Sequence, residues 1–190
     1  MTDFTIQFIN HASVLISDGK NGILSDPWYE GDAFDGGWGL IYENKSEDIN
    51  KILDSNGLWI SEFSYFPLLL KNLTYDQICH EHVTYYTLNT FNNVIKKNGL
   101  RIVDISFNEI NGGSIEVICA KKKSKFLSKE KKISEVLNDE KQINFDSYKR
   151  FNKRVNNTKK VIQLFLKNNK NKIIGYGAST KGNIVLNHCE

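Results

Sequence analysis

The sequence predicts an α/β protein with a small N-terminal β-meander, a second sheet that ends in an antiparallel pair of strands, and a mainly helical last third. Two observations support this prediction. Apolar residues alternate with polar ones in short segments near the N-terminus, and from residue 57 apolar strands alternate with segments of helical periodicity. A chain of 190 residues, 40% of them hydrophobic, is long enough for one good core or two small ones.

The N-terminal segment predicts a meander of three short strands. Phe4, Ile6 and Phe8 alternate with polar residues, and Asp18-Gly19 is a turn signal between two later apolar runs. Ser46, followed by acidic residues, is a helix start signal. The expected elements are strands at 4–8, 14–16 and 22–24, a loop over 29–44 and a helix from 46 to about 53.

The remaining elements follow from apolar runs and helical spacing. We expect a strand at 58–60 that ends in Ser61-Glu62, a helix at 87–98, strands at 100–105 and 114–120, helices at 128–138 and 145–168, a buried strand at 172–176 and a helix from Lys181. Gly112-Gly113 predicts the turn between the two middle strands. The last helix reaches Glu190 after hardly two turns, so we expect the C-terminal strand–helix unit to be incomplete.

The charge distribution does not favour nucleic acid as a partner. The net charge is only +3. The main basic cluster lacks interleaved aromatic residues and is interpreted as a solvated face; it consists of Lys121, Lys122, Lys123, Lys125, Lys129, Lys131 and Lys132.

Cysteine usage and the termini indicate a cytoplasmic protein without a membrane partner. Cys79, Cys119 and Cys189 lie far apart and form no CxxC pair, which argues against a structural zinc knuckle and suits a reducing cytoplasm. The N-terminus lacks the pattern of a secretory signal. The apolar run 68–70 is far too short to span a bilayer.

His80, Glu81 and His82 form the first candidate site. A polar loop without a role is one interpretation. A dinuclear zinc site would need the pattern His-x-His-x-Asp-His, and Thr84 and Tyr85 occupy the last two positions, so we expect no metal. The third interpretation is general-base chemistry. One histidine removes a carbon-bound or hydroxyl proton, while Glu81 and the other imidazole orient the substrate or the base.

The second candidate site is the glycine-punctuated turn Gly175-x-Gly177-x₄-Gly182. It follows an apolar segment and opens a helix, which favours contact between backbone N–H groups and an anion. Its spacing fits neither the dinucleotide fingerprint nor a Walker loop, because Lys181 is followed by glycine. A purely structural turn stays open as the alternative, but Lys181 favours a phosphate or pyrophosphate contact.

Residues from about 57 to 190 resemble the later part of the SAM-dependent sugar C-methyltransferases, which act on nucleotide-linked keto-deoxysugars. The matching stretches are Trp59-Ile-Ser-Glu62, Tyr75-Asp-Gln-Ile-Cys-His-Glu-His82 with Tyr85-Tyr86, Gly112-Gly113-Ser114, and Tyr176-Gly-Ala-Ser-Thr-Lys-Gly-Asn183 with Leu186-Asn187. The resemblance implies the end of a class I methyltransferase sheet followed by an incomplete Rossmann-like unit. It makes His82 the base that acts on the carbon beside the ketone, with Tyr176, Gly177, Lys181 and Asn183 binding the substrate. Cys79 replaces a tyrosine that is frequent in the family, so its phenol is lost.

In that family, a zinc-binding module and a SAM-binding Rossmann domain come first. No glycine-rich SAM cradle is found before residue 57, so SAM is the family's cofactor but we expect weak or no binding by this chain. Residues 1–54 instead resemble metallo-β-lactamase-fold hydrolases through His11-Ala-Ser-Val-Leu-Ile16, Ile23-Leu-Ser-Asp-Pro-Trp28 and Gly36-Gly37-Trp38. The stretch 59–61 fits either parent, and the chain is interpreted as a fusion of two truncated genes or an assembly artefact.

The resemblance of residues 57–190 implies a SAM-dependent C-methyltransferase acting on a nucleotide-linked keto-deoxysugar, in a partial or fused form whose own activity is in doubt. The expected domains are a stub at 1–54, the end of a SAM-methyltransferase domain at 55–123 and a truncated C-terminal domain at 124–190. A metallo-β-lactamase-fold hydrolase, which two bound zinc ions would favour, is one alternative. A non-catalytic nucleotide-sugar-binding remnant is the other.

Overall fold

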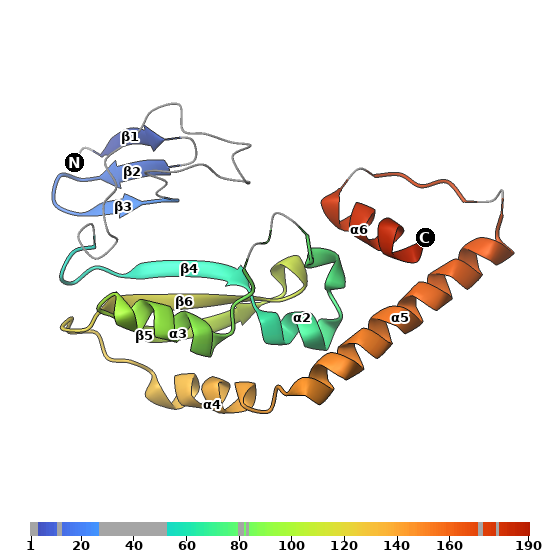
Figure 1. Cartoon of the computed structure of the whole chain (residues 1–190). Coiled ribbons are helices and arrows are strands. Elements are labelled where there is room, and N and C mark those ends of the chain that lie inside the picture. Colours follow the sequence, from blue (N-terminus) through green and yellow to red (C-terminus); the bar gives the residue numbers. More distant parts are fainter. Residues whose placement is uncertain are drawn as a thin grey trace. The chain divides into compact units, whose positions relative to one another are not determined.

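The chain folds into two compact units, each with its own sheet. The structure is a computed structural model and describes residues 4–10, 13–26, 53–79, 82, 84–170, 173–177 and 179–190. The units are Met1–Ile52 and Leu53–Glu190 (Figure 1). The three domains expected from the sequence stay a prediction.

The first unit contains the predicted meander. Its antiparallel sheet has the order β1-β2-β3, with β1 at Thr5–Asn10, β2 at Ser13–Ser17 and β3 at Gly22–Leu24. In the turn after β2, Asp18 Oδ1 accepts hydrogen bonds from two following backbone amides at 2.9 and 2.6 Å. Gly19 adopts a φ of 83°, which favours glycine. The predicted loop at 29–44 and nearly all of the helix predicted from 46 to about 53 lie outside the described residues.

The second unit contains an antiparallel sheet of order β4-β6-β5. Its strands are β4 (Trp59–Ser64), β5 (Leu100–Asn108) and β6 (Ser114–Lys121), so all three predicted strands are confirmed and run further than expected. The turn between β5 and β6 needs glycine twice. Gly112 and Gly113 have φ values of 80° and 125°, and a Cβ at Gly113 would come within 2.8 Å of the Leu68 side chain.

Five α-helices and two short 3₁₀ helices are described in this unit. They are α2 (Phe66–Asn72), η1 (Tyr75–Gln77), α3 (Leu88–Lys97), η2 (Ile110–Gly112), α4 (Glu130–Glu140), α5 (Phe145–Asn168) and α6 (Thr180–Cys189). The four helices predicted at 87–98, 128–138, 145–168 and from Lys181 are confirmed, whereas α2 was not predicted. No helix among the described residues is long and apolar enough to cross a bilayer.

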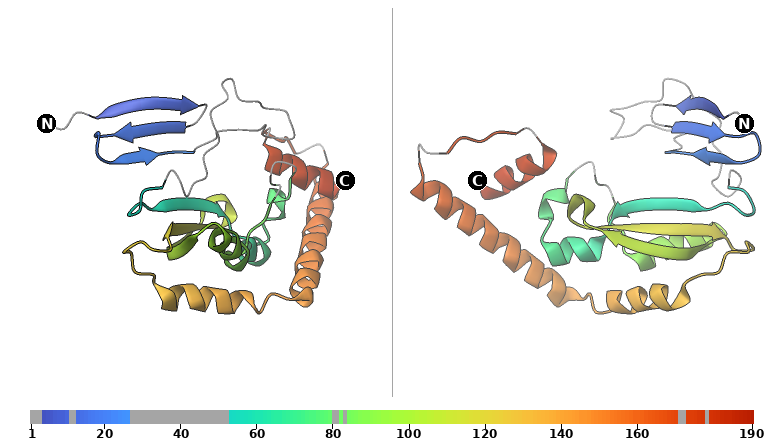
Figure 2. Two further views of the ribbon diagram at one scale, coloured as in Figure 1. Left: turned by 60° about the vertical axis from the view of Figure 1, so that its left-hand side comes forward. Right: turned by 180° about the vertical axis from the view of Figure 1, so that it is seen from behind.

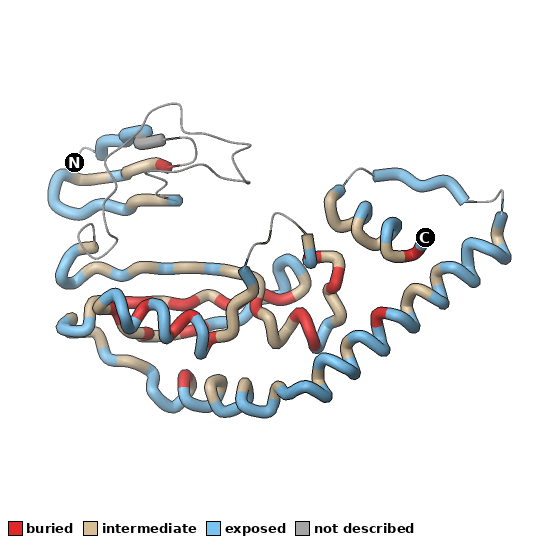
Figure 3. Tube along the Cα trace, in the orientation of Figure 1, coloured by how far each residue is buried: buried red, intermediate tan, exposed pale blue. Residues whose placement is uncertain are grey.

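Helix α3 packs on one face of the second sheet. The Phe91 ring on α3 lies 5.7 Å from the ring of Trp59 and 4.9 Å from that of Phe63, both on β4. On the opposite face, Glu62 and Glu116 are cross-strand neighbours. An antiparallel sheet with one covered face alternates in this way. The buried residues concentrate in β5, β6, α3 and α2 (Figure 3).

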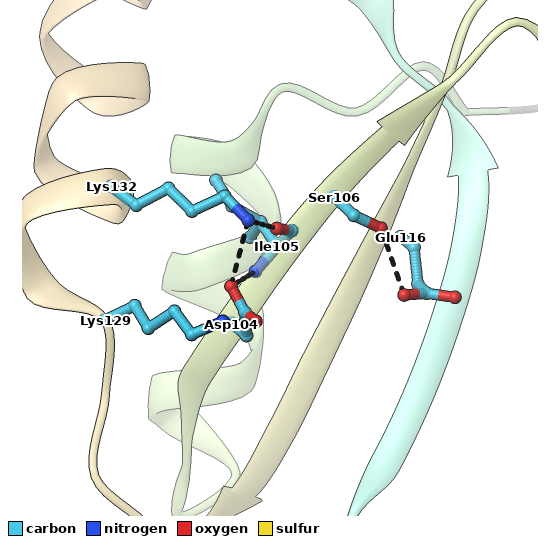
Figure 4. A network of polar contacts seen from close by, with 6 residues as sticks. All are labelled: Asp104, Ile105, Ser106, Glu116, Lys129 and Lys132. Carbon is cyan, nitrogen blue, oxygen red and sulfur yellow. Dashed lines mark hydrogen bonds and ion pairs between the residues drawn. The ribbon is translucent and has the colours of Figure 1, made fainter.

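The segment leading into α4 closes the free edge of β5. The Ser128 hydroxyl donates to the Ile102 carbonyl at 2.7 Å, and the Lys129 amide donates to the Val103 carbonyl at 2.8 Å. Asp104 lies at a register irregularity of β5 and pairs with the ammonium groups of Lys129 and Lys132 at 2.5 and 3.1 Å (Figure 4). These contacts protect a strand edge that would otherwise expose unpaired backbone groups.

Helix α5 is a single long helix (Figure 2), and Val155 is its one buried residue among those described. It begins at a capping box formed by Asn144 and Ser147. The guanidinium of Arg154 donates to the carbonyls of Leu70 and Lys71, at the end of α2, at 3.1 and 3.0 Å. Further along, Gln163 Nε2 donates to a carbonyl at the end of α6 at 2.9 Å. These contacts attach α5 to α2 and α6.

The buried strand predicted at 172–176 is wrong. Residues 173–177 form no strand, and Ile174 is 96% exposed. An extended segment becomes a strand only when a neighbour satisfies its backbone groups, and none of the described strands pairs with it. The described residues thus form a mixed α/β structure with two small antiparallel sheets, consistent with a partial methyltransferase-like fold.

Candidate functional site

His82 lies just after η1 and its ring is fixed by a backbone carbonyl. Its Nδ1 is 2.8 Å from the carbonyl oxygen of Gln77. A carbonyl only accepts hydrogen bonds, so Nδ1 carries the proton and donates. In the neutral imidazole, Nε2 then keeps its lone pair, which is the form that a general base needs.

The same carbonyl also orients Tyr85. The Tyr85 hydroxyl donates to the Gln77 oxygen at 3.1 Å, and the amide of Cys79 is a third donor at 3.0 Å. The Tyr85 ring meets the His82 ring edge-on, with centroids 6.3 Å apart. Burial raises the pKa of the Tyr85 hydroxyl. This phenol therefore stays protonated near neutral pH and acts as a donor.

The side chain of Gln77 is buried and bonded at both ends. The residue is 1% exposed. Its Oε1 accepts from the hydroxyl of Ser64, at the end of β4, at 2.7 Å, and its Nε2 donates to the carbonyl oxygen of Asn111 in η2. A buried amide with both groups satisfied is a stable anchor. It fixes the loop that carries His82 to the end of the sheet.

Asn111 extends this hydrogen-bond chain to Lys181. Asn111 has a φ of 54°, in the left-handed region that asparagine tolerates better than most residues. Its Oδ1 accepts from the ammonium of Lys181 at 3.1 Å. Lys181 stands in the first turn of α6, whose N-cap Ser179 accepts from the Gly182 amide at 3.1 Å. The structure thus connects two predicted site residues, His82 and Lys181, through Gln77 and Asn111.

A small cavity lies between η1, α5 and α6, and η1 also carries Gln77. It has a volume of about 280 Å³, and its lining includes Tyr75, Ile78, Val155, Ile184 and His188. The rings of Tyr75 and His188 meet edge-on at 5.4 Å. The Tyr75 hydroxyl and His188 Nε2 are buried and have no hydrogen-bond partner among the described residues. Burial also raises the pKa of Tyr75. Because neither atom is accessible, the cavity does not present these two polar groups to a ligand.

A larger cavity of about 550 Å³ lies between α2, β5, α4 and α5 and contains none of the predicted site residues. Its main acidic group, Glu140, accepts from the Tyr65 hydroxyl at 2.6 Å and from two amides at the start of α3. Burial and this carboxylate raise the pKa of Tyr65. Arg154 is bonded to the end of α2. These polar groups hold helix ends, which favours a structural role.

Among the other predicted residues, the described ones, Tyr176, Gly177 and Asn183, are not brought into this chain of hydrogen bonds. His80 and Glu81 lie outside the described residues. The Tyr176 side chain is fully exposed, and Gly177 has a φ of 144° with open space around it. Asn183 is exposed, and its amide donates to Ser179 within the helix start. Their predicted roles stay predictions.

Four contributors, Gln77, Asn111, Ser64 and Tyr85, were not predicted as site residues. Gln77 and Tyr85 fall inside a stretch already quoted for the resemblance, yet nothing in the sequence says that Gln77 is buried. The one available signal was Asn111 before Gly112-Gly113, because asparagine and glycine mark positions of positive φ.

The described residues contain no group of three or more His, Cys, Asp or Glu that could hold a metal ion. His11, His80 and Glu81 lie outside those residues, so the expectation of no metal stays a prediction.

The described residues do not fit SAM either. SAM sites in open α/β sheets lie at the carboxyl ends of parallel strands, and both described sheets are antiparallel. No glycine-rich turn from a strand into a helix is described next to either sheet. No chemical step through SAM follows from this arrangement.

Two comparisons with known proteins agree with the methyltransferase resemblance for the later part of the chain, and a third finds a hydroxylase. Residues 109–190 match the family of the C-methyltransferase C-terminal domain. The C-methyltransferase NovU of Streptomyces niveus is 29% identical over 147 residues, which are 74% of this chain and 35% of that protein. The cytidine monophosphate-N-acetylneuraminic acid hydroxylase of Danio rerio is 24% identical over 107 residues, 55% of this chain and 18% of that protein.

The chain thus spans about a third or less of the length of these two relatives. None of these matches shows the metallo-β-lactamase resemblance of residues 1–54. The similarity supports the conclusion that the later part of this chain is related to C-methyltransferases.

Proposed function

We propose that this chain provides the base and substrate contacts of a SAM-dependent C-methyltransferase that acts on a nucleotide-linked keto-deoxysugar. The observation that carries the proposal is the fixed imidazole of His82, with Nδ1–H bonded to Gln77 and the lone pair left on Nε2. The similarity to C-methyltransferases suggests which reaction this base would serve, namely proton removal before methylation at carbon.

The proposed step is removal of a proton from the carbon beside the ketone. His82 Nε2 takes the proton, and the electron pair of the C–H bond moves toward the carbonyl to form an enolate. SAM supplies the methyl group in the family, and no step through SAM is assigned to the described residues. His80 and Glu81, which directly precede the base in sequence, orient the substrate or the base.

Lys181 is the proposed contact for the pyrophosphate of the sugar nucleotide. Its ammonium is held by a neutral amide rather than a carboxylate, so its charge is not neutralised by that partner. Backbone amides at the start of α6 add partial positive charge. Tyr176, Gly177 and Asn183 lie on the same stretch, and the full exposure of Tyr176 leaves its ring free to contact a ligand.

One further observation fits a nucleotide-linked substrate. The name of the second relative includes a cytidine monophosphate-linked sugar acid as its substrate. The three free cysteines suit a cytoplasmic setting.

The second candidate function is binding of a nucleotide sugar without methyl transfer. The antiparallel sheets, which offer no SAM site among the described residues, favour it. Sugar-nucleotide binding together with absence of proton removal would support this alternative.

Hydrogen–deuterium exchange at the carbon beside the ketone distinguishes the two candidate functions, because it reports proton removal without requiring SAM. The full chain is incubated in D₂O with a nucleoside diphosphate-linked 4-keto-6-deoxyglucose, and proton NMR follows loss of the signal from the carbon beside the ketone. We expect wild type to accelerate exchange and His82→Ala to lose about 100-fold or more of that rate. His188→Gln is the matched control, because it removes another half-buried imidazole but leaves the Gln77 contact.

Equal exchange rates for wild type and His82→Ala would reject His82 as the base. Binding of the sugar nucleotide with no exchange above the rate in buffer would favour the binding function instead.

A further inference from the structure

Gln77 is the most constrained polar residue near the candidate site, and its contacts reach further than the loop that it anchors. It is 1% exposed, and its side chain joins the end of β4 to η2. Ser64 lies 13 residues before it and Asn111 lies 34 residues after it, so the side chain connects distant segments. Its backbone carbonyl is thereby held in one place.

That carbonyl determines which nitrogen of His82 carries the proton. Tyr85 and the Cys79 amide already donate to the oxygen from fixed positions. The His82 ring, with Nδ1 2.8 Å from this oxygen, can donate to it only when Nδ1 is protonated, because otherwise two lone pairs would face each other. A histidine that lacked this contact would distribute its proton between both nitrogens. The position of Gln77 therefore selects the tautomer whose Nε2 can act as a base.

Asn111 joins the same side chain to the anion contact. Its backbone oxygen accepts from Gln77, whereas its side-chain oxygen accepts from Lys181 at 3.1 Å. The two functions of Asn111 are separable, because glycine at this φ of 54° keeps the backbone oxygen in place and removes only the side chain.

We propose that Gln77 is a positioning residue that holds His82 in the Nδ1–H tautomer and, through Asn111, fixes the position of Lys181. The catalytic consequence rests on the proposed function, but the tautomer and the position of the lysine do not. A role in folding stability alone would change neither of them.

The test uses the full chain labelled with ¹⁵N-histidine. Long-range proton–nitrogen NMR near neutral pH reports the tautomer of each imidazole, and His82→Gln identifies the His82 signals. We expect Nδ1–H with unprotonated Nε2 in wild type. In Gln77→Leu we expect the ratio of Nδ1–H to Nε2–H to fall by up to about tenfold, the equivalent of one hydrogen bond.

Asn111→Gly is the matched variant, and it carries the test if Gln77→Leu does not fold. We expect it to keep the His82 tautomer while weakening the affinity for inorganic pyrophosphate by about fivefold, because Lys181 loses its orienting acceptor. Calorimetric titration with pyrophosphate measures this effect.

An Nε2–H tautomer of His82 in wild type would overturn the proposal. Folded Gln77→Leu with an unchanged tautomer would do the same, as would an unchanged pyrophosphate affinity in Asn111→Gly. The predicted tautomer in a wild type that catalyses no solvent exchange would support the positioning role and reject the proposed base function.

Discussion

The sheet with α3 and the pair of helices α5 and α6 differ sharply in how they are packed, although both belong to the second unit. Several apolar side chains of the first region are 0–2% exposed: Leu88, Ile95, Leu100, Ile105, Ile115, Val117 and Cys119. Among the described residues of α5 and α6, only Val155 and Cys189 are buried. Large apolar side chains such as Leu164 and Phe165 on α5 are 59% exposed. Figure 3 shows the same contrast along the trace.

The two halves of the candidate site therefore differ in packing: one is attached to the buried core and the other lies on a weakly packed helix. His82 is anchored through Gln77 to the end of β4, whereas Lys181 comes from α6 and has one described side-chain partner, Asn111. Segments with few buried contacts open at a lower free energy than a packed core. The geometry of the proposed base is therefore set by the core, whereas the proposed anion contact depends on a few polar bonds.

The largest expected effect is the loss of a core side chain. Leu88 is completely buried against the sheet, so Leu88→Ala should lower the free energy of unfolding by about 2–5 kcal/mol. Leu164→Ala, the matched change on α5, should cost about 0.5 kcal/mol or less because that side chain is already exposed.

Urea denaturation followed by far-ultraviolet circular dichroism measures both variants, since every described helix lies in the second unit. Losses of similar size in the two variants would remove the basis for the comparison.

A smaller effect is expected at the covered edge of the same sheet. The hydrogen bond from Lys129, more than that from Lys132, lowers the pKa of Asp104 to about 2 (Figure 4). A carboxyl whose pKa is lower in the folded than in the unfolded protein stabilises the fold at any pH above its unfolded-state pKa. This contribution disappears as the pH falls toward the folded-state pKa of about 2. Because both lysine side chains are substantially exposed, Asp104→Asn should cost about 1 kcal/mol or less at neutral pH.

The difference in unfolding free energy between wild type and Asp104→Asn should therefore shrink between about pH 5 and about pH 2. A difference that stays constant over this range would show that the carboxylate charge does not stabilise this edge.

The sequence predicted most of the regular elements because their periodicity is local. Helix α5 spans 24 residues, enough to establish a helical period, and its bounds agree with the prediction. Helix α2 was missed because its seven residues are too few to establish a period. The run at 172–176 was predicted as a strand on hydrophobicity alone, and hydrophobicity cannot supply the neighbouring strand that pairing needs.

The candidate site could be predicted only in part for the same reason. The types of His82 and Lys181 indicate their chemistry. Gln77 acquires its role from Ser64 and Asn111, which are distant in sequence, so no local pattern marks it. A buried, fully bonded amide becomes visible only when the tertiary contacts are known.

The central claim is that His82 and Lys181 serve one ligand although they come from regions packed so differently. Its most direct test compares the rate of solvent exchange at the carbon beside the ketone for the nucleotide-linked keto-deoxysugar and for the same sugar without its nucleotide, at equal low concentrations. Wild type should prefer the nucleotide-linked sugar by about tenfold or more, because a charge-assisted contact to the pyrophosphate adds binding energy. Lys181→Ala should lose this preference and leave exchange of the free sugar unchanged. An undiminished preference in Lys181→Ala, or no preference in wild type, would contradict the assignment of both residues to one site.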